Sequence, residues 1–358
     1  MTVPIAKIRG ALALSFLFAA SCTKAPPDDP ICSYEPLPET AGVPAEQGAV
    51  MISGSTNEYI HLTDPAGKQL TSGRVGAALK AKPGEYRARL NSSIHPVFVR
   101  AKTLTKCAAG AVLISGGTDE YYYVHEVAAG TQLASSKIGQ AAGLFPGKYR
   151  ILVNRTSAEV EIKPGAVSEL KAALLLARGS TDEYYYVLDS AGTQLASSKL
   201  SAPLSLLPAK LTLKINNATA PLEITPGATV ELQTGALMVR GTTDEYYYVL
   251  DAAGNQLASS KLNQAVSFVA GAYTVRVNNV KMPAKVEAGK TSEYQTATLT
   301  VKASANNYYY VLDANGTNLA SKRLNESLAI PEGSYSVKVG DDTRPVTLSA
   351  TKTVVVNW

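Results

Sequence analysis

Short stretches of alternating apolar and polar residues, separated by turn residues, run through most of the chain. In the stretch after Gly271, for example, every second residue from Tyr273 to Val277 is apolar. Because successive side chains of a β-strand point to opposite faces of a sheet, this pattern predicts strands with one face in a core and one in water. No stretch keeps the 3.6-residue period and the capping residues of a helix. The pattern therefore predicts an all-β protein built from short strands.

This pattern is written five times, with a period of 62 or 63 residues. Each copy opens on small residues followed by an apolar run, as in Gly110-Ala111-Val112 and Gly235-Ala236-Leu237. Each copy has room for six or seven strands, so we expect five tandem, small antiparallel β-sandwich modules. A core of this size is near the lower limit for independent stability, so packing between neighbours is expected to matter. The expected modules 1 to 5 span residues 48–109, 110–171, 172–234, 235–296 and 297–358.

A run of tyrosines marks the second strand of four copies. The first copy has Ile60 and Leu62 in place of the middle tyrosine and of the valine that follows the run, so these positions are expected to face the core. The first and third tyrosines of each run then lie on the opposite face. These outward candidates are Tyr121, Tyr123, Tyr184, Tyr186, Tyr246, Tyr248, Tyr308 and Tyr310.

Two interpretations of the outward tyrosines follow from the chemistry of the side chain, a flat apolar ring with a hydroxyl that tolerates water. In the first, the pairs pack against the next module or a second sheet, which Leu188, Leu250 and Leu312 at the end of the same strip favour. In the second, they form a repeated platform that binds sugar rings or a protein partner, with avidity from multiple contacts. The sequence favours the first interpretation.

The N-terminus has the features of an export signal. Lys7 and Arg9 precede an apolar run at residues 11–20, which is shorter than the roughly 20 residues needed to span a bilayer. The sequence Ala19-Ala20-Ser21-Cys22 resembles the lipobox of bacterial lipoproteins. The resemblance implies a signal peptide at residues 1–21, lipidation of Cys22 and, because no aspartate follows the cysteine, an outer-membrane location. Ordinary cleavage beside the same small residues is the alternative.

Residues 22–47 are rich in proline and acidic residues and poor in apolar ones. This composition predicts a flexible, partly extended tether between the lipid and the first module. Exported proteins meet an oxidising compartment, so Cys32 and Cys107 are expected to form a disulfide that ties the tether to the end of module 1. Closing a loop of this length contributes ~4 kcal/mol in the chain-entropy model. Two free thiols are the alternative.

The order of strands and turns also resembles a known group of proteins. A tyrosine- or valine-rich strand ends in Asp and a Gly turn, and Pro146-Gly147-Lys148-Tyr149-Arg150 and Pro164-Gly165 follow it in the second copy. This order resembles the PEGA-type extracellular β-sandwich repeats of bacterial envelope proteins, although the PEGA signature itself is absent. The resemblance implies a non-catalytic surface module and assigns no functional residue.

The reactive side chains do not form a catalytic or metal-binding pattern. Three tyrosine runs follow Thr-Asp-Glu, as in Asp182-Glu183, but adjacent strand residues point to opposite faces, so a solvated strand entry is the expected role. His61, His95 and His125 lack metal-ligand spacing, and no hydrolase or nucleotide-loop motif occurs. We therefore expect no catalytic residue, no cofactor and no metal site.

The net charge of +5 is spread along the chain without the basic clusters of nucleic-acid-binding proteins, so nucleic acid is not an expected partner. The leading hypothesis is a non-enzymatic, lipid-anchored outer-membrane scaffold that binds another envelope protein through its tyrosine strips. The alternative is an array that binds cell-wall or extracellular polysaccharide through the outward tyrosines and a basic row. This row consists of Arg89, Lys214, Arg276 and Lys338. A calcium-stiffened spacer is a third idea with less support, because the Asp–Gly turns lack further oxygen ligands.

Overall fold

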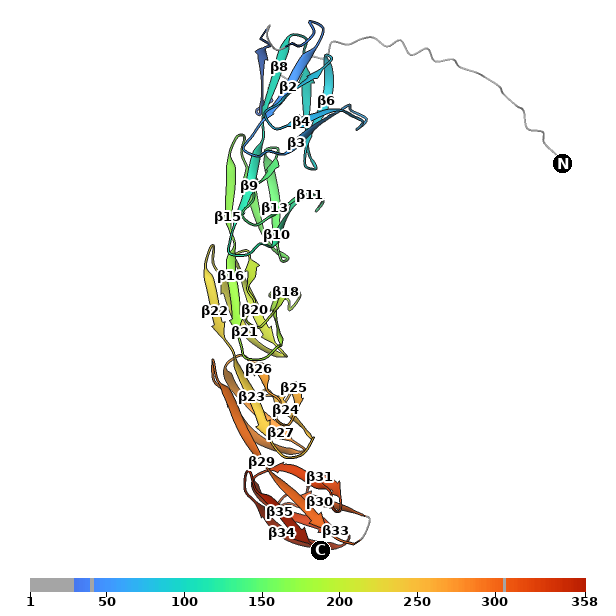
Figure 1. Cartoon of the computed structure of the whole chain (residues 1–358), viewed down its shortest axis with the longest axis vertical. Helices are drawn as coiled ribbons and strands as arrows, with labels where there is room; N and C mark the ends of the chain where they lie inside the picture. The colour runs from blue at the N-terminus through green and yellow to red at the C-terminus, as the bar shows by residue number, and fades with distance from the viewer. Residues whose placement is uncertain (1–28, 39–41, 305–306) are drawn as a thin grey trace, which may run out of the picture.

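A computed structural model describes residues 29–38, 42–304 and 307–358; the signal peptide and Cys22 lie outside these ranges. Throughout these ranges the regular elements are β-strands. The part of the chain that the structure describes contains no helix long and apolar enough to cross a membrane. The strands form modules in single file along the long axis, from β2 (Gly48–Ser53) to β35 (Thr353–Asn357) (Figure 1). The expected all-β array of tandem modules is confirmed.

Module 2 shows the common plan of two facing sheets. Its strands are β9 (Gly110–Ser115), β10 (Tyr121–Glu126), β11 (Gln132–Lys137), β12 (Ala142–Leu144), β13 (Gly147–Val153), β14 (Thr156–Ile162) and β15 (Val167–Lys171). The sheet β11-β10-β13-β14, here called the tyrosine sheet, is fully antiparallel. The sheet β12-β9-β15, here called the linking sheet, contains a parallel pair, β9–β15. The modules are therefore not purely antiparallel, because the last strand returns beside the first in the same direction.

The other modules repeat this plan. Module 1 adds β3 (Tyr59–Thr63), β4 (Gln69–Arg74), β5 (Ala78–Ala81), β6 (Gly84–Leu90), β7 (Ser93–Val99) and β8 (Thr103–Ala108) to β2. Module 3 has β16 (Ala173–Arg178), β17 (Tyr184–Leu188), β18 (Gln194–Lys199), β19 (Leu204–Leu206), β20 (Ala209–Ile215), β21 (Ala218–Ile224) and β22 (Thr229–Gln233). The pairing register places Ala173, not Ala172, at the position of Gly110, so this copy starts one residue later than expected.

Modules 4 and 5 share one strand. Module 4 has β23 (Gly235–Arg240), β24 (Tyr246–Leu250), β25 (Gln256–Lys261), β26 (Val266–Phe268), β27 (Gly271–Val277) and β28 (Val280–Val286). Module 5 has β30 (Tyr308–Leu312), β31 (Asn318–Arg323), β32 (Ser327–Pro331), β33 (Gly333–Val339) and β34 (Asp342–Leu348) before β35. The shared strand, β29 (Thr291–Lys302), pairs with β23 in its first half and with β35 in its second. The boundary expected between residues 296 and 297 lies inside this strand.

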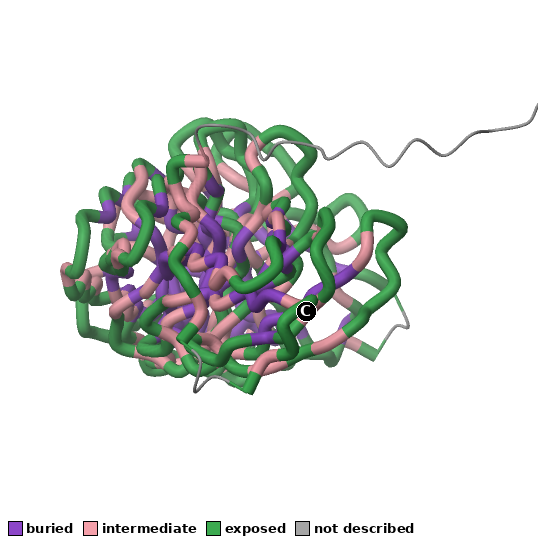
Figure 2. Tube along the Cα trace, turned by 90° about the horizontal axis from the view of Figure 1, so that it is seen from above, coloured by how far each residue is buried: buried purple, intermediate pink, exposed green. Residues whose placement is uncertain are grey.

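The core of each module lies between its two sheets, and a view along the array shows buried positions inside a rim of exposed ones (Figure 2). The middle tyrosines Tyr122, Tyr185, Tyr247 and Tyr309 are fully buried, as the substitution in the first copy indicated. The Tyr247 hydroxyl lies 3.0 Å from the carbonyl oxygen of Leu237 and 2.7 Å from that of Gln264. The polar end of the ring is thus satisfied inside the core.

The start of the described chain is fixed to module 1. Cys32 is bonded to Cys107, which confirms the expected disulfide. Residues 32–36 were expected in a flexible tether, but they form β1 (Cys32–Pro36), which pairs antiparallel with β8. His95 Nε2 lies 2.9 Å from a carboxylate oxygen of Asp29. A polar segment becomes a strand here because the open edge of the linking sheet supplies backbone hydrogen-bond partners.

The module junctions contain no loop. One buried residue separates the last strand of a module from the first strand of the next at the first three junctions, namely Ala109, Ala172 and Thr234. Each donates its backbone N–H across the linking sheet, to Ser53, Ser115 and Arg178 respectively, at 2.8, 2.8 and 2.9 Å. Bending a junction would break buried backbone hydrogen bonds, which is costly.

Candidate functional site

A glutamate directly before the tyrosine run joins one module to the next. Glu183 Oε2 accepts a 2.6 Å hydrogen bond from the backbone N–H of Ser267 in module 4 and a 2.7 Å bond from the Thr181 hydroxyl. The side-chain amide of Asn216 donates to Glu183 Oε1 at 2.9 Å and to the Ser267 carbonyl oxygen at 2.8 Å. Module 3 therefore holds both backbone polar groups of Ser267.

Local turn chemistry places this asparagine. Asn216 lies in the tight hairpin between β20 and β21 with φ at 52°. Asparagine tolerates this left-handed conformation better than most residues, and it is typical of such hairpins. The same side chain then reaches the neighbouring module, so one residue closes the turn and joins the two modules.

The two bonds that hold the backbone of one residue, from its N–H to the glutamate and from the asparagine amide to its carbonyl oxygen, are here called the clasp, and they occur at all four junctions. The clasp glutamates are Glu58, Glu120, Glu183 and Glu245, the clasp asparagines are Asn91, Asn154, Asn216 and Asn278, and the residues held are Gly143, Ser205, Ser267 and Ala329. The four bonds from backbone N–H to carboxylate measure 2.6–2.7 Å. Lys322 Nζ also lies 3.1 Å from Glu245 Oε1 at the last junction.

The clasp corrects the role expected for the Thr-Asp-Glu segments. The aspartates Asp119, Asp182 and Asp244 are exposed, as a solvated strand entry requires. The glutamates beside them are half-buried and bridge two modules. This bridging role could not be predicted from the sequence, because each glutamate bonds a residue 84 or 85 positions further along the chain.

The end modules differ at the clasp positions. In module 5, Asn307 takes the place of the glutamate and Gly340 the place of the asparagine. Module 5 therefore lacks the carboxylate that its neighbours use. In module 1, Lys80 lies at the strand position of Gly143, and its Nζ donates a 2.7 Å hydrogen bond to the carbonyl oxygen of Gly42.

The outward tyrosines are exposed to solvent. The first tyrosines of the runs, Tyr121, Tyr184, Tyr246 and Tyr308, are 51%, 47%, 49% and 43% exposed. Tyr123 and Tyr310 are also exposed, and Tyr186 and Tyr248 are half-buried. The interpretation favoured from sequence, in which these rings pack against a neighbouring module or a second sheet, is therefore wrong for the six exposed rings. The clasp and the linking sheet make the junctions instead.

The leucines that follow the outward tyrosines lie beside a register shift. The pairing of β24 with β25 shifts between Val249 and Leu250, and the equivalent strands of the other modules shift at the same place. The extra residue of this shift, Leu257, lies on β25, so β24 keeps its own alternation. Leu250 is buried and Leu188 and Leu312 are half-buried, a difference that the pairing does not explain.

Cations lie across the strand pairs from the outward tyrosines. Tyr246 pairs with Lys261 on β25, whose Nζ lies 5.9 Å from the ring centre. Tyr248 pairs with Arg276 on β27, whose Cζ lies 4.6 Å from the ring centre. We call these four residues the basic–aromatic quartet. Cation–π attraction holds the rings and the charges together on the surface.

The quartet recurs with small changes. It is Lys199, Tyr184, Tyr186 and Lys214 in module 3, and Arg323, Tyr308, Tyr310 and Lys338 in module 5. Module 1 has Arg74, Tyr59, His61 and Arg89, and module 2 has Lys137, Tyr121, Tyr123 and Leu152. The row that contains Arg276 is visible in the sequence, and the row that contains Lys261 was not predicted. Its signal was the basic residue that ends the strand after each Gly turn, as at Lys199 and Lys261.

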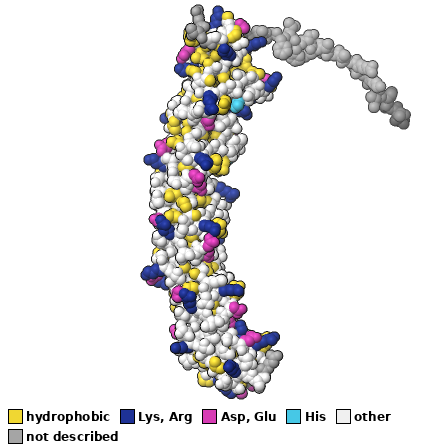
Figure 3. Space-filling model, viewed as in Figure 1, with side chains coloured by type: hydrophobic (Ala, Val, Ile, Leu, Met, Phe, Trp, Pro, Cys, Tyr) yellow, Lys and Arg dark blue, Asp and Glu magenta, His cyan; other side chains and the backbone are white. Residues whose placement is uncertain are grey.

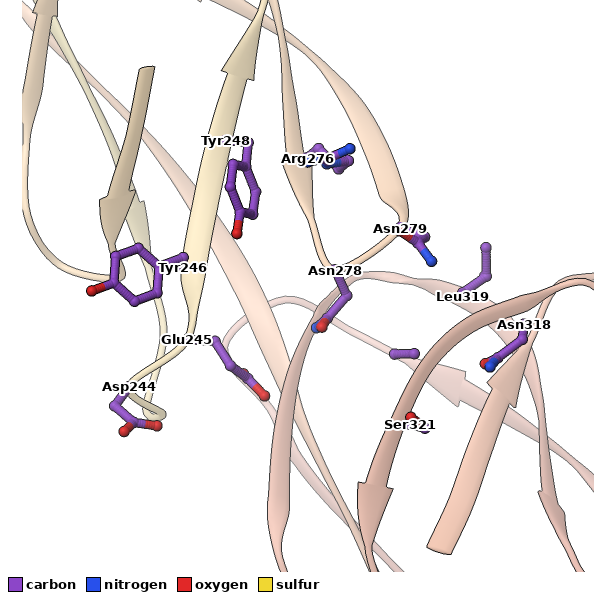
Figure 4. A pocket seen from close by; sticks show the side chains of 11 residues that line it. Asp244, Glu245, Tyr246, Tyr248, Arg276, Asn278, Asn279, Asn318, Leu319 and Ser321 are labelled. Atoms are coloured by element: carbon purple, nitrogen blue, oxygen red, sulfur yellow. The ribbon is translucent and has the colours of Figure 1, made fainter. Parts of the chain in front are cut away.

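A groove lies beside the quartet where modules 4 and 5 meet (Figure 4). Its volume is about 550 Å³, and a similar groove of about 440 Å³ lies between modules 3 and 4. Tyr248, Arg276, Asn278, Asn279 and Leu319 line the first, and Tyr186, Lys214, Asn216, Asn217 and Leu257 take their places in the second. Figure 4 shows Tyr248 and Arg276 on one side and Leu319 and Asn318 of the next module on the other.

Other chemistry is sparse in the described residues. Asp29, Cys32 and His95 place possible metal-ligand atoms close together, but the Cys32 sulfur is committed to the disulfide. Charged side chains are distributed along the visible face of the array (Figure 3). The feature that recurs from module to module is therefore the surface of aromatic rings and cations on the tyrosine sheet. Such a surface is suited to binding a ligand or a partner.

No family model matches the sequence, and no curated protein matches it. Among solved structures, the chain is similar to the Bacillus anthracis TIE protein (TM-score 0.16, 11% identity, over 76% of this chain and 75% of that one). It is also similar to the minor pilin of Streptococcus agalactiae, with a TM-score of 0.15 and 12% identity over 52% of this chain and 94% of that one. A variant of the major pilin subunit of Bacillus cereus matches with a TM-score of 0.18 and 10% identity over 87% of this chain and 99% of that one. TM-scores this low carry no conclusion about the activity or partners of this chain.

Proposed function

We propose that this chain is a non-enzymatic scaffold of the bacterial outer membrane, anchored by lipid on Cys22, whose stiff array holds a binding face away from the membrane. The observation that carries the proposal is the clasp, because one glutamate and one asparagine side chain hold the backbone of the next module at each of four junctions. The strand continuity of the linking sheet supports the same stiffness. An enzyme needs one constellation of unlike groups, whereas here one surface recurs in module after module.

The proposed partner of this face is another envelope component. The leading candidate from the sequence is an envelope protein that binds the outward tyrosines. A polysaccharide is the second candidate, and the exposure of flat rings such as Tyr246 beside cations supports it. The lipobox and PEGA-type resemblances support the location in the envelope. Nucleic acid is not a proposed partner.

Fractionation of cells that produce the full chain tests the anchor. The native chain is expected in the outer-membrane fraction, and Cys22→Ser is expected to move it to the soluble periplasmic fraction. The control is the double variant Cys32→Ser, Cys107→Ser, which removes the disulfide and leaves the lipid site intact. A native chain in the soluble fraction would overturn the anchor.

Crosslinking in intact cells tests the binding face. A photoreactive phenylalanine at Tyr248 is expected to capture an envelope component, and the same group at Lys171 on the linking sheet serves as the control. A captured protein supports the leading candidate, and a captured glycan supports the second. Equal yields from the two positions would contradict a role for the tyrosine face.

A further inference from the structure

We propose that the ligand of the tyrosine sheet is an anionic polysaccharide whose rings lie on the outward tyrosines and whose acidic groups enter the junction grooves. This inference rests on the second candidate function above and names its ligand class. The basic–aromatic quartets of modules 3, 4 and 5 and the two grooves between these modules repeat the same polar and aromatic groups.

The charge of the tyrosine sheet indicates an anionic ligand. In module 4 its strands β24, β25, β27 and β28 carry no acidic residue. They carry four cations, Lys261, Arg276, Lys281 and Lys285. Asp244 lies at the groove margin, and the Glu245 carboxylate is engaged by Lys322 and by the backbone of Ala329. Lys285 Nζ lies 3.7 Å from a carboxylate oxygen of Glu287, so Lys261, Arg276 and Lys281 are the cations of this sheet that have no ion-pair partner among the described residues. Their positive charge favours acidic partners.

Arg276 is the group best placed to bind an acid. Its guanidinium stacks on Tyr248, and its Nε is buried without a hydrogen-bond partner among the described residues. A buried donor without a partner is costly, and a planar guanidinium matches a carboxylate, sulfate or phosphate through two parallel bonds. Lys214 keeps the positive charge at the same position of the groove between modules 3 and 4.

The remaining groove residues suit a sugar. The side chains of Asn279 and Asn318 offer amide donors and acceptors for hydroxyl groups, and Leu319 offers an apolar wall. The groove volume of about 550 Å³ lies within the usual range for ligand sites, about 300–1,000 Å³. Tyr248 presents a flat ring at the groove side, where the apolar face of a sugar ring packs well (Figure 4).

The repetition favours a polymer over a folded protein. Standard protein interfaces have a hydrophobic centre that excludes water, whereas both outward tyrosines of module 4 lie beside cations. Equivalent groups recur in successive modules, so a chain of repeating acidic sugars would meet several of them at once. Weak contacts then add to a useful avidity.

The first test is affinity electrophoresis of the full chain in detergent through gels that contain one polymer each. The probes are polygalacturonate, neutral dextran, polyglutamate and oligo-dT. Polygalacturonate is expected to bind at least tenfold more tightly than each of the others. Equal binding to dextran would overturn the role of charge, equal binding to polyglutamate would overturn the role of the sugar ring, and equal or tighter binding to oligo-dT would indicate nucleic acid instead.

The second test uses charge-matched variants. Lys214→Gln, Arg276→Gln and Lys338→Gln together are expected to weaken binding to polygalacturonate at least tenfold. The control removes three exposed cations elsewhere, Lys171→Gln, Lys302→Gln and Lys352→Gln, and is expected to stay within twofold. Equal losses in the two variants would overturn the proposed site.

A third variant tests the rings. We expect binding to polygalacturonate to weaken at least tenfold in the triple variant Tyr186→Ala, Tyr248→Ala and Tyr310→Ala. The corresponding phenylalanine variant is expected to retain most of the binding. Thermal unfolding checks that each variant is folded. If the array is folded and extended but does not bind polysaccharide, this inference alone is overturned. If the array is flexible, the proposed scaffold is contradicted.

Discussion

Glu183 in module 3 and Ser267 in module 4 are joined by a hydrogen bond of 2.6 Å between the carboxylate and a backbone N–H. A charged acceptor makes this kind of bond stronger than a neutral pair, with a net contribution of about 1.5–3 kcal/mol. Asn216 holds the carbonyl oxygen of the same residue, so Ser267 is fixed at both ends of its backbone. Four such contacts join the five modules, and the proposed stiffness of the array rests on them.

Removing one clasp carboxylate should destabilise its junction. Glu183→Ala leaves the Ser267 N–H without its acceptor, so the free energy of unfolding of modules 3 and 4 should fall by about 1–3 kcal/mol. Hydrogen exchange should show faster exchange at Ser267. The matched control is Asp182→Ala, which removes the adjacent exposed carboxylate and should change stability by no more than about 0.5 kcal/mol. Equal effects of the two variants would contradict the clasp.

Two neighbouring tyrosines should respond differently to loss of the hydroxyl. Tyr247→Phe leaves the buried carbonyl oxygens of Leu237 and Gln264 without this donor, so it should lower the free energy of unfolding by about 1–3 kcal/mol. Tyr248→Phe changes a surface residue and should remain within about 0.5 kcal/mol. Denaturant titration measures both, and a larger effect at Tyr248 would mean that the two faces of β24 are assigned the wrong way round.

The array should lose stability at high pH. Burial raises the pKa of Tyr122, Tyr149 and Tyr185 from 10.0 to about 12, because the interior disfavours the charged phenolate. The folded state therefore holds protons that the unfolded state releases, so the free energy of unfolding should be unaffected by these groups below pH 10 and should fall between about pH 10 and 12. Tyrosinate absorbance of the folded protein should show that these three buried rings ionise only near pH 12. A single population near pH 10 in the folded protein would contradict the buried assignment.

The disulfide should stabilise module 1 alone. Cys32 and Cys107 close a loop with a sequence separation of 75, so the double variant Cys32→Ser, Cys107→Ser should lower the free energy of unfolding of module 1 by ~4 kcal/mol. Hydrogen exchange should report faster exchange in β1 and β8, and module 5 serves as the internal control. Unchanged protection of β1 would show that pairing with β8 and the contact between Asp29 and His95 hold the segment without the disulfide.

The alternation of the sequence was sufficient to predict the modules and their inward faces. The substitution of Ile60 and Leu62 for a tyrosine and a valine identified the buried side of the strand, and the structure places both residues in the core. The turn glycines and the period defined the repeat. These features are local, because a strand and its turn are specified within a few residues.

Contacts between distant residues could not be predicted in the same way. Glu183 meets Ser267 only because the stacked modules bring residues 84 positions apart together, and Lys261 meets Tyr246 only through the register of β24 and β25. The register shift before Leu250 likewise has no local signal in the alternation. The clasp and the quartet therefore became visible only in three dimensions.

Small-angle scattering from the full chain, in detergent matched to the solvent, tests the central claim that the clasps make a stiff array. The native chain and a control with Asp119→Ala, Asp182→Ala and Asp244→Ala are expected to scatter as one extended body. A variant with Glu58→Ala, Glu120→Ala, Glu183→Ala and Glu245→Ala is expected to show a shorter mean maximum dimension and a broader distribution of distances. A native chain that is already flexible, or a clasp variant that scatters as the native chain does, would contradict the account.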